Sequence, residues 1–444
     1  MRLTIHGGAP LVGSLRVPAD KSITHRALIF SALAKGTSVV TARGAGEDNL
    51  STARVLRGLG VQITRDGDTF HIVGNGAESF KEPTEPLDCG NSGTTMRLMS
   101  GVLAGSGVKC TLVGDGSLMK RPMGRVCRPL RQIGADISGV MQADRELAPL
   151  SISKGRVNDG LSKLEIASAQ VKSCLLLAGL VAGRKVTVHE PSLSRDHTER
   201  LLGAMGANIS TLNNAGQPGV RILPGDLAPM HLEVPGDFSS AAFVLSAATI
   251  IPGSRVTVRD VGVNATRTGL LEIMEELRAE VSVTKWREAT GEPVADVVAQ
   301  ASELDARQAG ERPTIVAGDV VPRLIDELVV ISALAARARG RVEVKDATEL
   351  RVKESDRIAE VVRLCAAFGI TVDAHRDGFI IDGPQPMSPA NVDVSSDHRV
   401  ALTAAVLALA TPGISVLEGF DVAAVSFPTF VADMRALGAR IEVS

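Results

Sequence analysis

Cations stand where several apolar helices are predicted to begin. The segment "DKSITHRALIFSA" (residues 20–32) carries Lys21 and Arg26 in the first turns of such a helix. A helix N-terminus bears a partial positive charge, so cations there are unfavourable unless an anion meets them. The same feature recurs at further helix starts, with the cations Arg97, Lys172, Arg323 and Arg399. The pattern predicts sites for a polyanionic small molecule, although ordinary helix capping would explain each start taken singly.

Two other segments concentrate charge. "GDGSLMKRPMGR" (114–125) holds Lys120 and Arg121 in a Gly-rich turn, and "ELRVKESDRIAEVVRL" (349–364) begins an amphipathic helix. In the second segment Glu354 and Arg357 are three residues apart and are predicted to pair. A solvated loop and a salt-bridged helix start are the alternative interpretations.

Several function classes are disfavoured. Asp20 stands where a P-loop needs its second Gly, and "GNSGTT" has no Lys, which argues against a nucleotide triphosphatase. The His and Cys residues form no metal-ligand spacing, so no metal is expected. Aromatic residues make up 2% of the chain and the net charge is -2, which argues against a nucleic-acid partner.

The cellular setting is predicted from the start of the chain and from cysteine usage. "MRLTIHGGAP" lacks the apolar core of a signal peptide, and no apolar run is long enough for a membrane span. The five cysteines are odd in number and are expected to be small buried hydrophobes in a reducing compartment. We therefore expect a cytoplasmic protein without a membrane partner.

A repeat organises the chain. Six amphipathic helices each end before a turn position and a strand, with the turn positions at Gly60, Gly134, Gly206, Arg278, Gly369 and Gly438. Six more apolar helices start near residues 20, 91, 168, 237, 322 and 396. Glycine at such a turn is the expected C′ cap of the preceding helix. The chain is predicted to be an α+β protein of six units of about 70 residues, three per domain, with a break within 232–240.

Eight motifs in order resemble the 5-enolpyruvylshikimate-3-phosphate synthase family, in its class II bacterial branch. They are "DKSITHR", "GNSGTTMR", "GDGSLMKRPMGR", "ASAQVKS", "RDHTER", "PGDFSS", "LRVKESDR" and "DHR". The resemblance implies two similar domains, each of three βαβαββ units in an inside-out barrel, which close over the substrates. One domain would comprise residues 1–18 and 236–444, and the other residues 19–235. It also implies a monomer that needs neither a metal nor an organic cofactor.

The family reaction transfers the enolpyruvyl group of phosphoenolpyruvate to the 5-hydroxyl of shikimate 3-phosphate and releases phosphate. By resemblance, Asp326 is the base, and Glu354 donates the proton to carbon with Lys21 or Lys353 nearby. The residues implied for shikimate 3-phosphate are Lys21, Ser22, Arg26, Ser168, Gln170, Arg195, Asp326 and Lys353. Those implied for phosphoenolpyruvate are Lys21, Gly93, Arg121, Gln170, Arg357 and Arg399. His25 is expected to be structural.

Some positions bear on specificity. Val425 and Ser426 stand where some family members have Lys, so one phosphoenolpyruvate contact is expected to be absent or supplied elsewhere. Gly93 is Ala in members that tolerate glyphosate, so we expect this inhibitor to bind here. The closest rival is the sister enzyme that acts on UDP-N-acetylglucosamine; it has Cys in the loop that spans residues 114–122 here, where this chain has none. A non-catalytic anion-binding repeat protein is the alternative from another class.

Overall fold

The structure is a computed structural model that describes residues 1–214, 216–309 and 311–444. The chain forms two compact units, each with its own hydrophobic core. Unit 1 comprises Met1–Pro18, Pro235–Arg287 and Pro293–Ser444, and unit 2 comprises Ala19–Val234 and Glu288–Glu292. Each unit is described by itself below.

Unit 2 is built on three buried apolar helices. These are α1 (Lys21–Leu33), α3 (Gly93–Ser106) and α5 (Ala169–Val181). Three helices with one exposed face accompany them: α2 (Glu47–Gly58), α4 (Gly124–Gln132) and α6 (His197–Ala204). Short 3-10 helices lie at Ala77–Ser79 and Leu118–Lys120. The buried helices are apolar all round because they lie inside the unit, whereas the others are amphipathic.

Three four-stranded sheets complete unit 2. The first has the order β14 (His231–Glu233), β3 (Lys35–Thr41), β5 (Thr69–Asn75), β4 (Gln62–Asp66). The second is β6 (Leu87–Asp88), β7 (Cys110–Val113), β9 (Arg145–Ser153), β8 (Asp136–Gln142). The third is β10 (Gly160–Lys163), β11 (Val186–His189), β13 (Gln217–Ile222), β12 (Ile209–Asn214).

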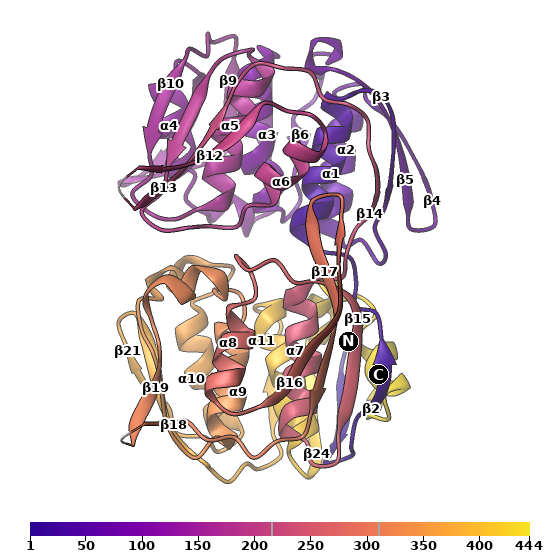
Figure 1. Cartoon of the computed structure of the whole chain (residues 1–444), viewed down its shortest axis with the longest axis vertical. Coiled ribbons are helices and arrows are strands. Elements are labelled where there is room, and N and C mark those ends of the chain that lie inside the picture. The colour runs from indigo at the N-terminus through magenta and orange to yellow at the C-terminus, as the bar shows by residue number, and fades with distance from the viewer. Residues whose placement is uncertain (215, 310) are drawn as a thin grey trace. The chain divides into compact units, whose positions relative to one another are not determined.

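Unit 1 repeats this plan. Its buried helices are α7 (Phe238–Ile250), α9 (Leu328–Arg337) and α11 (His398–Ala410). Its amphipathic helices are α8 (Gly269–Glu276), α10 (Arg357–Ala367) and α12 (Phe430–Ala436). Three 3-10 helices lie at Gly318–Arg323, Thr348–Val352 and Phe420–Val425. In Figure 1 the helices of each unit lie among its own sheets.

The sheets of unit 1 are also three in number. The first has the order β16 (Glu280–Ala289), β17 (Glu292–Gln300), β15 (Arg255–Gly262), β2 (Val12–Leu15). The second is β18 (Arg307–Gln308), β19 (Arg312–Val316), β20 (Gly340–Val344), β22 (Gly378–Gly383), β21 (Asp373–His375). The third is β23 (Asn391–Asp393), β24 (Gly413–Glu418), β1 (Leu3–Gly7), β25 (Arg440–Val443).

One strand pattern recurs in all six sheets. Each contains one parallel pair, such as β6 with β7 or β10 with β11, and its other neighbours are antiparallel. In four of the sheets a single α-helix links the two parallel strands, as α3 links β6 with β7 and α5 links β10 with β11. Strands distant in sequence complete three of the sheets: β14 pairs with β3, β2 with β15, and β1 lies between β24 and β25. The expected α+β fold of repeated βαβαββ units is confirmed.

The six predicted turn positions share a left-handed backbone. The values of φ are 89° at Gly60, 94° at Gly134, 87° at Gly206, 60° at Arg278, 81° at Gly369 and 107° at Gly438. Glycine adopts this conformation without steric cost, which explains its recurrence after the outer helices. Arg278 adopts the left-handed conformation as well, so the fourth repeat keeps the same turn geometry without glycine.

Five of the six buried helices begin within two residues of the predicted starts. The fifth is different: a 3-10 helix occupies Gly318–Arg323, and α9 begins only at Leu328. The expected start near residue 322 is therefore wrong. Leu324 has φ -140°, which is not helical, so the first turn cannot continue. The later start places Asp326 and Glu327 just ahead of α9.

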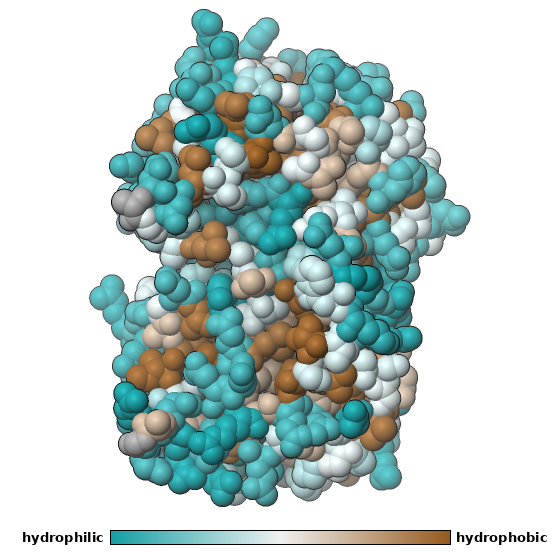
Figure 2. Space-filling model, viewed as in Figure 1, coloured by the Kyte–Doolittle hydropathy of each residue, from teal (hydrophilic) through white to brown (hydrophobic). Residues whose placement is uncertain are grey.

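Burial and surface composition agree with the sequence patterns. All five cysteines are buried free thiols, as expected, and burial raises the pKa of Cys110 and Cys365 to about 12. On the face drawn in Figure 2, hydrophilic and hydrophobic residues are interspersed, which is ordinary for a protein surface. Within the residues described, no helix is long and apolar enough to cross a membrane.

Candidate active site

The N-termini of the three buried helices of unit 2 lie together. Side chains cap each helix: Asp20 accepts from Ile23 N at 2.9 Å, Ser92 from Thr95 N at 3.1 Å, and Ser168 from Val171 N at 3.5 Å. Gln170, in the first turn of α5, joins two of them. Its Oε1 accepts from Arg97 at 2.6 Å, and its Nε2 donates to Thr94 Oγ1 at 2.9 Å, both on α3. Arg26 of α1 also donates to Ser173 of α5 at 2.9 Å, so the three helices present their positive N-terminal ends on one side of the unit.

Two cations of α1 have different surroundings. Lys21 Nζ lies 3.0 Å from the carboxylate of Asp48 at the start of α2. Arg26 is 2% exposed, and within the described part of the chain it bonds only to neutral oxygens: Thr198 Oγ1 at 2.7 Å, Ser173 Oγ at 2.9 Å and the carbonyl of Ser22 at 3.0 Å. Burial lowers the pKa of Arg26 to about 10, so it remains charged at neutral pH. Arg195, in the turn before α6, contributes to that lowering and hence lies close enough to repel Arg26.

The turn before α4 approaches the start of α3. Arg121 follows the 3-10 helix Leu118–Lys120, and its Nη2 donates to Asn91 Oδ1 at 2.5 Å. A Cβ atom built on Gly93 would lie 3.1 Å from Arg97 Nη1 and 3.5 Å from Arg121 Nη1. Gly93 therefore leaves room beside two guanidinium groups that a methyl group would occupy.

Lys172 is a correction to the sequence interpretation. Its side chain is fully buried, and its Nζ lies 2.8 Å from Glu190 Oε2 and 2.7 Å from Glu199 Oε1. Burial opposes the charge of Lys172, but Glu199 and Glu190 hold its pKa above the ordinary value. Lys172 is therefore already neutralised by the protein and adds nothing to a surface for anions.

Unit 1 gathers carboxylates and cations around Arg357, the first residue of α10. The guanidinium is 1% exposed and contacts three carboxylates: Asp397 at 2.9 Å, Glu354 at 2.7 Å and Asp326 at 3.3 Å. Burial opposes its charge, yet Asp397, Glu354 and Asp326 raise the pKa of Arg357 well above its usual range. The pairing of Glu354 with Arg357 is confirmed. Lys353 Nζ lies 3.8 Å from Asp326, on the same side of the cluster.

Arg399, in the first turn of α11, completes this cluster. It lies 4.0 Å from Asp326 and 3.9 Å from Glu327, at the limit of an ion pair. Asp397 caps α11 by accepting from Arg399 N at 2.8 Å. Burial disfavours the ionised carboxylate, but Arg357 and His398 hold the pKa of Asp397 below its ordinary value. The starts of α9, α10 and α11 thus bring the carboxylates of Asp326 and Glu354 together with three cations.

Arg323 does not join this cluster, which is a second correction. It closes the 3-10 helix ahead of α9, and its guanidinium pairs with Glu272 of α8. Like Lys172, it meets a carboxylate that is distant in sequence. Lys172 and Arg323 both lie near helix starts in the sequence, yet carboxylates of the protein neutralise both. Position near a helix start therefore does not identify a cation that could bind a ligand.

The comparisons with known proteins bear on this arrangement. A model of the family EPSP synthase (3-phosphoshikimate 1-carboxyvinyltransferase) matches residues 5–434. The chain belongs to the EPSP synthase family. A 3-phosphoshikimate 1-carboxyvinyltransferase of Synechococcus sp. (strain RCC307) is 45% identical over 438 residues, which cover 98% of each protein. One of Desulforudis audaxviator is 43% identical over 439 residues, covering 98% of this chain and 99% of its own.

Solved structures agree. EPSP synthase from Acinetobacter baumannii matches with a TM-score of 0.85 and 38% identity, over 100% of this chain and 99% of that one. The enolpyruvyl transferase NikO from Streptomyces tendae matches with a TM-score of 0.74 over 99% of this chain, at 18% identity. The second likeness concerns the fold alone.

The residues implied by resemblance to the EPSP synthase family divide between the two units. Unit 2 holds Lys21, Ser22, Arg26, Gly93, Arg121, Ser168, Gln170 and Arg195, and unit 1 holds Asp326, Lys353, Glu354, Arg357 and Arg399. Within each unit they lie just before a helix or in its first two turns. In the described ranges, no group of His, Cys, Asp and Glu side chains is arranged to hold a metal ion.

Two residues that hydrogen-bond to arginines of the candidate site, Asp397 and Thr198, were not predicted from the sequence. Asp397 supports Arg357, and Thr198 supports Arg26. Both lie in family motifs, "DHR" and "RDHTER", so the sequence marks their segments. The partners could not be assigned because they are 40 and 172 residues away in the chain.

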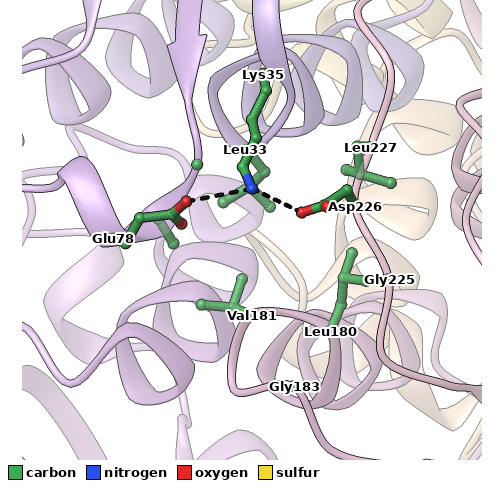
Figure 3. Close-up of a pocket in the computed structure, with 11 residues that line it drawn as sticks. Leu33, Lys35, Glu78, Leu180, Val181, Gly183, Gly225, Asp226 and Leu227 are labelled. Atoms are coloured by element: carbon green, nitrogen blue, oxygen red, sulfur yellow. Dashed lines mark hydrogen bonds and ion pairs between the residues drawn. The ribbon is translucent and has the colours of Figure 1, made fainter.

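A cavity of about 350 Å³ lies elsewhere in unit 2, at the C-terminal ends of α1 and α5. Figure 3 shows Lys35 at this cavity between Glu78 and Asp226, to which its Nζ is 3.7 Å and 3.0 Å distant. The lining includes none of the residues that resemble the EPSP synthase site. Its cation is paired with two exposed carboxylates, so the cavity lacks the unpaired positive charge found around Arg26.

Proposed function

We propose that this chain transfers the enolpyruvyl group of phosphoenolpyruvate to the 5-hydroxyl of shikimate 3-phosphate and releases phosphate. The observation that carries the proposal is the cluster around Arg357, in which Asp326 and Glu354 lie among Lys353, Arg357 and Arg399. A protein that only bound anions would need the cations but not the two carboxylates. Family membership supports the same reaction.

The reaction proceeds by addition and then elimination. Protonation of the methylene carbon of phosphoenolpyruvate makes C2 electrophilic, and the 5-hydroxyl adds to give a tetrahedral ketal. Loss of phosphate and a proton restores the enol ether. Asp326 takes the proton of the 5-hydroxyl, and Glu354 supplies the proton to carbon with Lys21 or Lys353 nearby. Each step needs an acid or base within hydrogen-bond reach of the reacting atom.

The cations bind the anionic groups of the two substrates. We assign Lys21, Ser22, Arg26, Ser168, Gln170, Arg195, Asp326 and Lys353 to shikimate 3-phosphate. Phosphoenolpyruvate is assigned to Lys21, Gly93, Arg121, Gln170, Arg357 and Arg399. Arg26 supports this assignment, because a buried guanidinium with only neutral partners gains most from a phosphate or carboxylate. Val425 and Ser426 offer no cation of their own.

The direct test measures phosphate release with both substrates and with each omitted. Release should require both shikimate 3-phosphate and phosphoenolpyruvate. UDP-N-acetylglucosamine in place of shikimate 3-phosphate should give none, and release with it would overturn the proposal. Light scattering should give the 46.4 kDa of a monomer, and cell fractionation should find the native protein in the cytoplasm.

Asp326→Asn separates catalysis from binding. We expect turnover to fall about 100-fold or more, since this is the usual contribution of one general base. The amide still hydrogen-bonds, so the affinity for shikimate 3-phosphate should change little. The matched control is Asp382→Asn, which removes an exposed carboxylate paired with Arg341 at 2.8 Å and should leave turnover unchanged. Unimpaired turnover with lost binding in Asp326→Asn would contradict a catalytic role.

A further inference from the structure

The hydrogen bonds around Arg26 have one consistent direction. Ser173 Oγ lies 2.5 Å from the carbonyl of Ala169, to which it must donate its proton. Ser173 can then only accept from Thr198 Oγ1, 2.6 Å away, so the Thr198 hydroxyl donates to it. Thr198 Oγ1 in turn accepts from Arg26 Nε, and Ser173 Oγ accepts from Arg26 Nη2. Each hydroxyl thereby donates once, as its single proton allows.

This chain of bonds occupies one edge of the guanidinium. The Nε and Nη2 nitrogens face the two hydroxyls, and Nη1 donates to the carbonyl of Ser22. Arg has five N–H donors, so two of those on Arg26 remain for a ligand. Among the residues described, no carboxylate lies within 4.0 Å of the Arg26 guanidinium. Arg357 and Lys172, by contrast, each contact two or more carboxylates.

Thr198 is itself held firmly in the first turn of α6. Its neighbours in the "RDHTER" motif anchor that turn: Glu199 pairs with Lys172 of α5 at 2.7 Å, and His197 with Glu292 at 2.8 Å. All of these residues belong to unit 2 and are buried. Because His197 and Glu199 hold the backbone on both sides of Thr198, its side chain loses little conformational entropy when it orients Arg26.

We propose that Thr198 is a positioning residue that, together with Ser173, orients Arg26 for an anionic group of shikimate 3-phosphate. The proposal rests on the proposed function, in which Arg26 binds that substrate. The two hydroxyls hold the Nε and Nη2 edge without neutralising its charge. Hydroxyl groups leave the positive charge of Arg26 available to attract the substrate, whereas a carboxylate in the same place would neutralise that charge.

The test replaces the hydroxyl without changing the shape of the side chain. Thr198→Val is nearly isosteric, whereas Thr198→Ser keeps the hydroxyl. In Thr198→Val the affinity for shikimate 3-phosphate, measured by titration calorimetry, should fall about 10- to 100-fold, the range for a hydrogen bond to a charged group. The KM for phosphoenolpyruvate should change less than threefold or so, because Arg26 is not assigned to it. Thr198→Ser should restore most of the affinity.

The matched control is Thr314→Val in unit 1. Thr314 is fully buried, and its Oγ1 also accepts an N–H, from Gln308 at 2.8 Å, and donates to a carbonyl, that of Ala306. Thr314→Val should lower the melting temperature about as much as Thr198→Val does, but it should not alter the affinity for shikimate 3-phosphate. An equal loss of affinity in both variants would overturn the proposal, since it would reflect stability alone. If Thr198→Val does not fold, Ser173→Ala is measured in its place with the same expectations.

Arg26→Ala distinguishes failure of this inference from failure of the proposed substrate contact. If Arg26→Ala leaves the affinity for shikimate 3-phosphate unchanged, the assignment of Arg26 is wrong. If Arg26→Ala weakens binding and Thr198→Val does not, only the positioning role is wrong. In the double variant, Thr198→Val should add no further loss, because Thr198 acts through Arg26. Additive losses would contradict the proposal.

Discussion

Two buried arginines illustrate how side-chain partners reveal function at the scale of single residues. Arg357 meets three carboxylates, whereas Arg26 meets two hydroxyls and a carbonyl. Burying a charge without an opposite charge is unfavourable. Arg26 therefore has most to gain from an anionic ligand. Arg357 instead pairs with Asp326 and Glu354, so a substrate anion at this guanidinium would compete with those carboxylates.

Gly93→Ala is predicted to weaken glyphosate binding while the fold is retained. The added methyl would lie 3.1 Å from Arg97 Nη1, the movable end of a long side chain, so the fold should adjust. One misplaced methyl costs about 1–3 kcal/mol in a tight site, so the inhibition constant should rise about tenfold or more. Gly116→Ala in the neighbouring turn is the control, because nothing lies within 4 Å of its new Cβ. An unchanged inhibition constant in Gly93→Ala would contradict the steric argument.

His25 should make unit 2 less stable in mild acid. Burial lowers its pKa from 6.5 to about 3 in the folded chain. Below pH 6.5 the unfolded chain gains a proton that the folded chain excludes, so stability falls as pH falls from about 6.5 towards 3. At about pH 5 this amounts to about 2 kcal/mol.

The variant His25→Asn should remove that loss, since Asn can keep the bond that His25 Nδ1 makes to Thr52 at 2.7 Å. Urea unfolding at about pH 7.5 and about pH 5 measures the difference. His231→Asn is the control, because His231 is exposed on β14. A pH dependence in His25→Asn equal to that of the parent chain would show that His25 is not the group responsible.

At the scale of elements, the turn after each amphipathic helix determines the repeat. Five of the six turns use glycine at positive φ, and the fourth uses Arg278 at φ 60°. The helix ends two residues before the turn position in all six, and the strand begins two to four residues after it. Backbone geometry, rather than residue identity, is therefore what the repeats share.

Arg278→Gly is predicted to stabilise unit 1 by about 1 kcal/mol, the usual cost of a left-handed backbone at a residue other than glycine. The pair lost with it, to Asp305 at 3.8 Å, is 65% exposed on the Arg side and contributes little. Urea unfolding measures the change. The reverse control is Gly206→Ala at φ 87°, where nothing lies within 4 Å of a new Cβ. It should destabilise unit 2 by about 1 kcal/mol through the backbone alone. Destabilisation by Arg278→Gly would contradict the account of the turn.

At the scale of the whole molecule, the chain has two hydrophobic cores with no buried residue in common. We propose that residues 1–18 with 236–444, and residues 19–235, form domains that unfold as separate units. A core loses its cooperativity only where its own contacts are removed.

Leu175→Ala in α5 and Leu402→Ala in α11 test this proposal. Both side chains are fully buried, one in each core, and each truncation should cost about 2–5 kcal/mol. In calorimetry each variant should lower one of two unfolding transitions and leave the other unchanged. A single transition lowered equally by both variants would contradict independent domains.

The sequence by itself determined the features that depend on neighbours along the chain. Capping residues, apolar helices and C′ turns involve contacts across a few residues, and the eight ordered motifs identified the family. The tertiary structure alone decided which cations are open to a ligand. Lys172 and Arg26 look alike beside their helix starts, but Lys172 meets Glu190 and Glu199, whereas Arg26 meets Thr198, 172 residues away. Electrostatic partners depend on distance in space, so spacing along the chain could not separate a cation that carboxylates neutralise from one that meets only neutral groups.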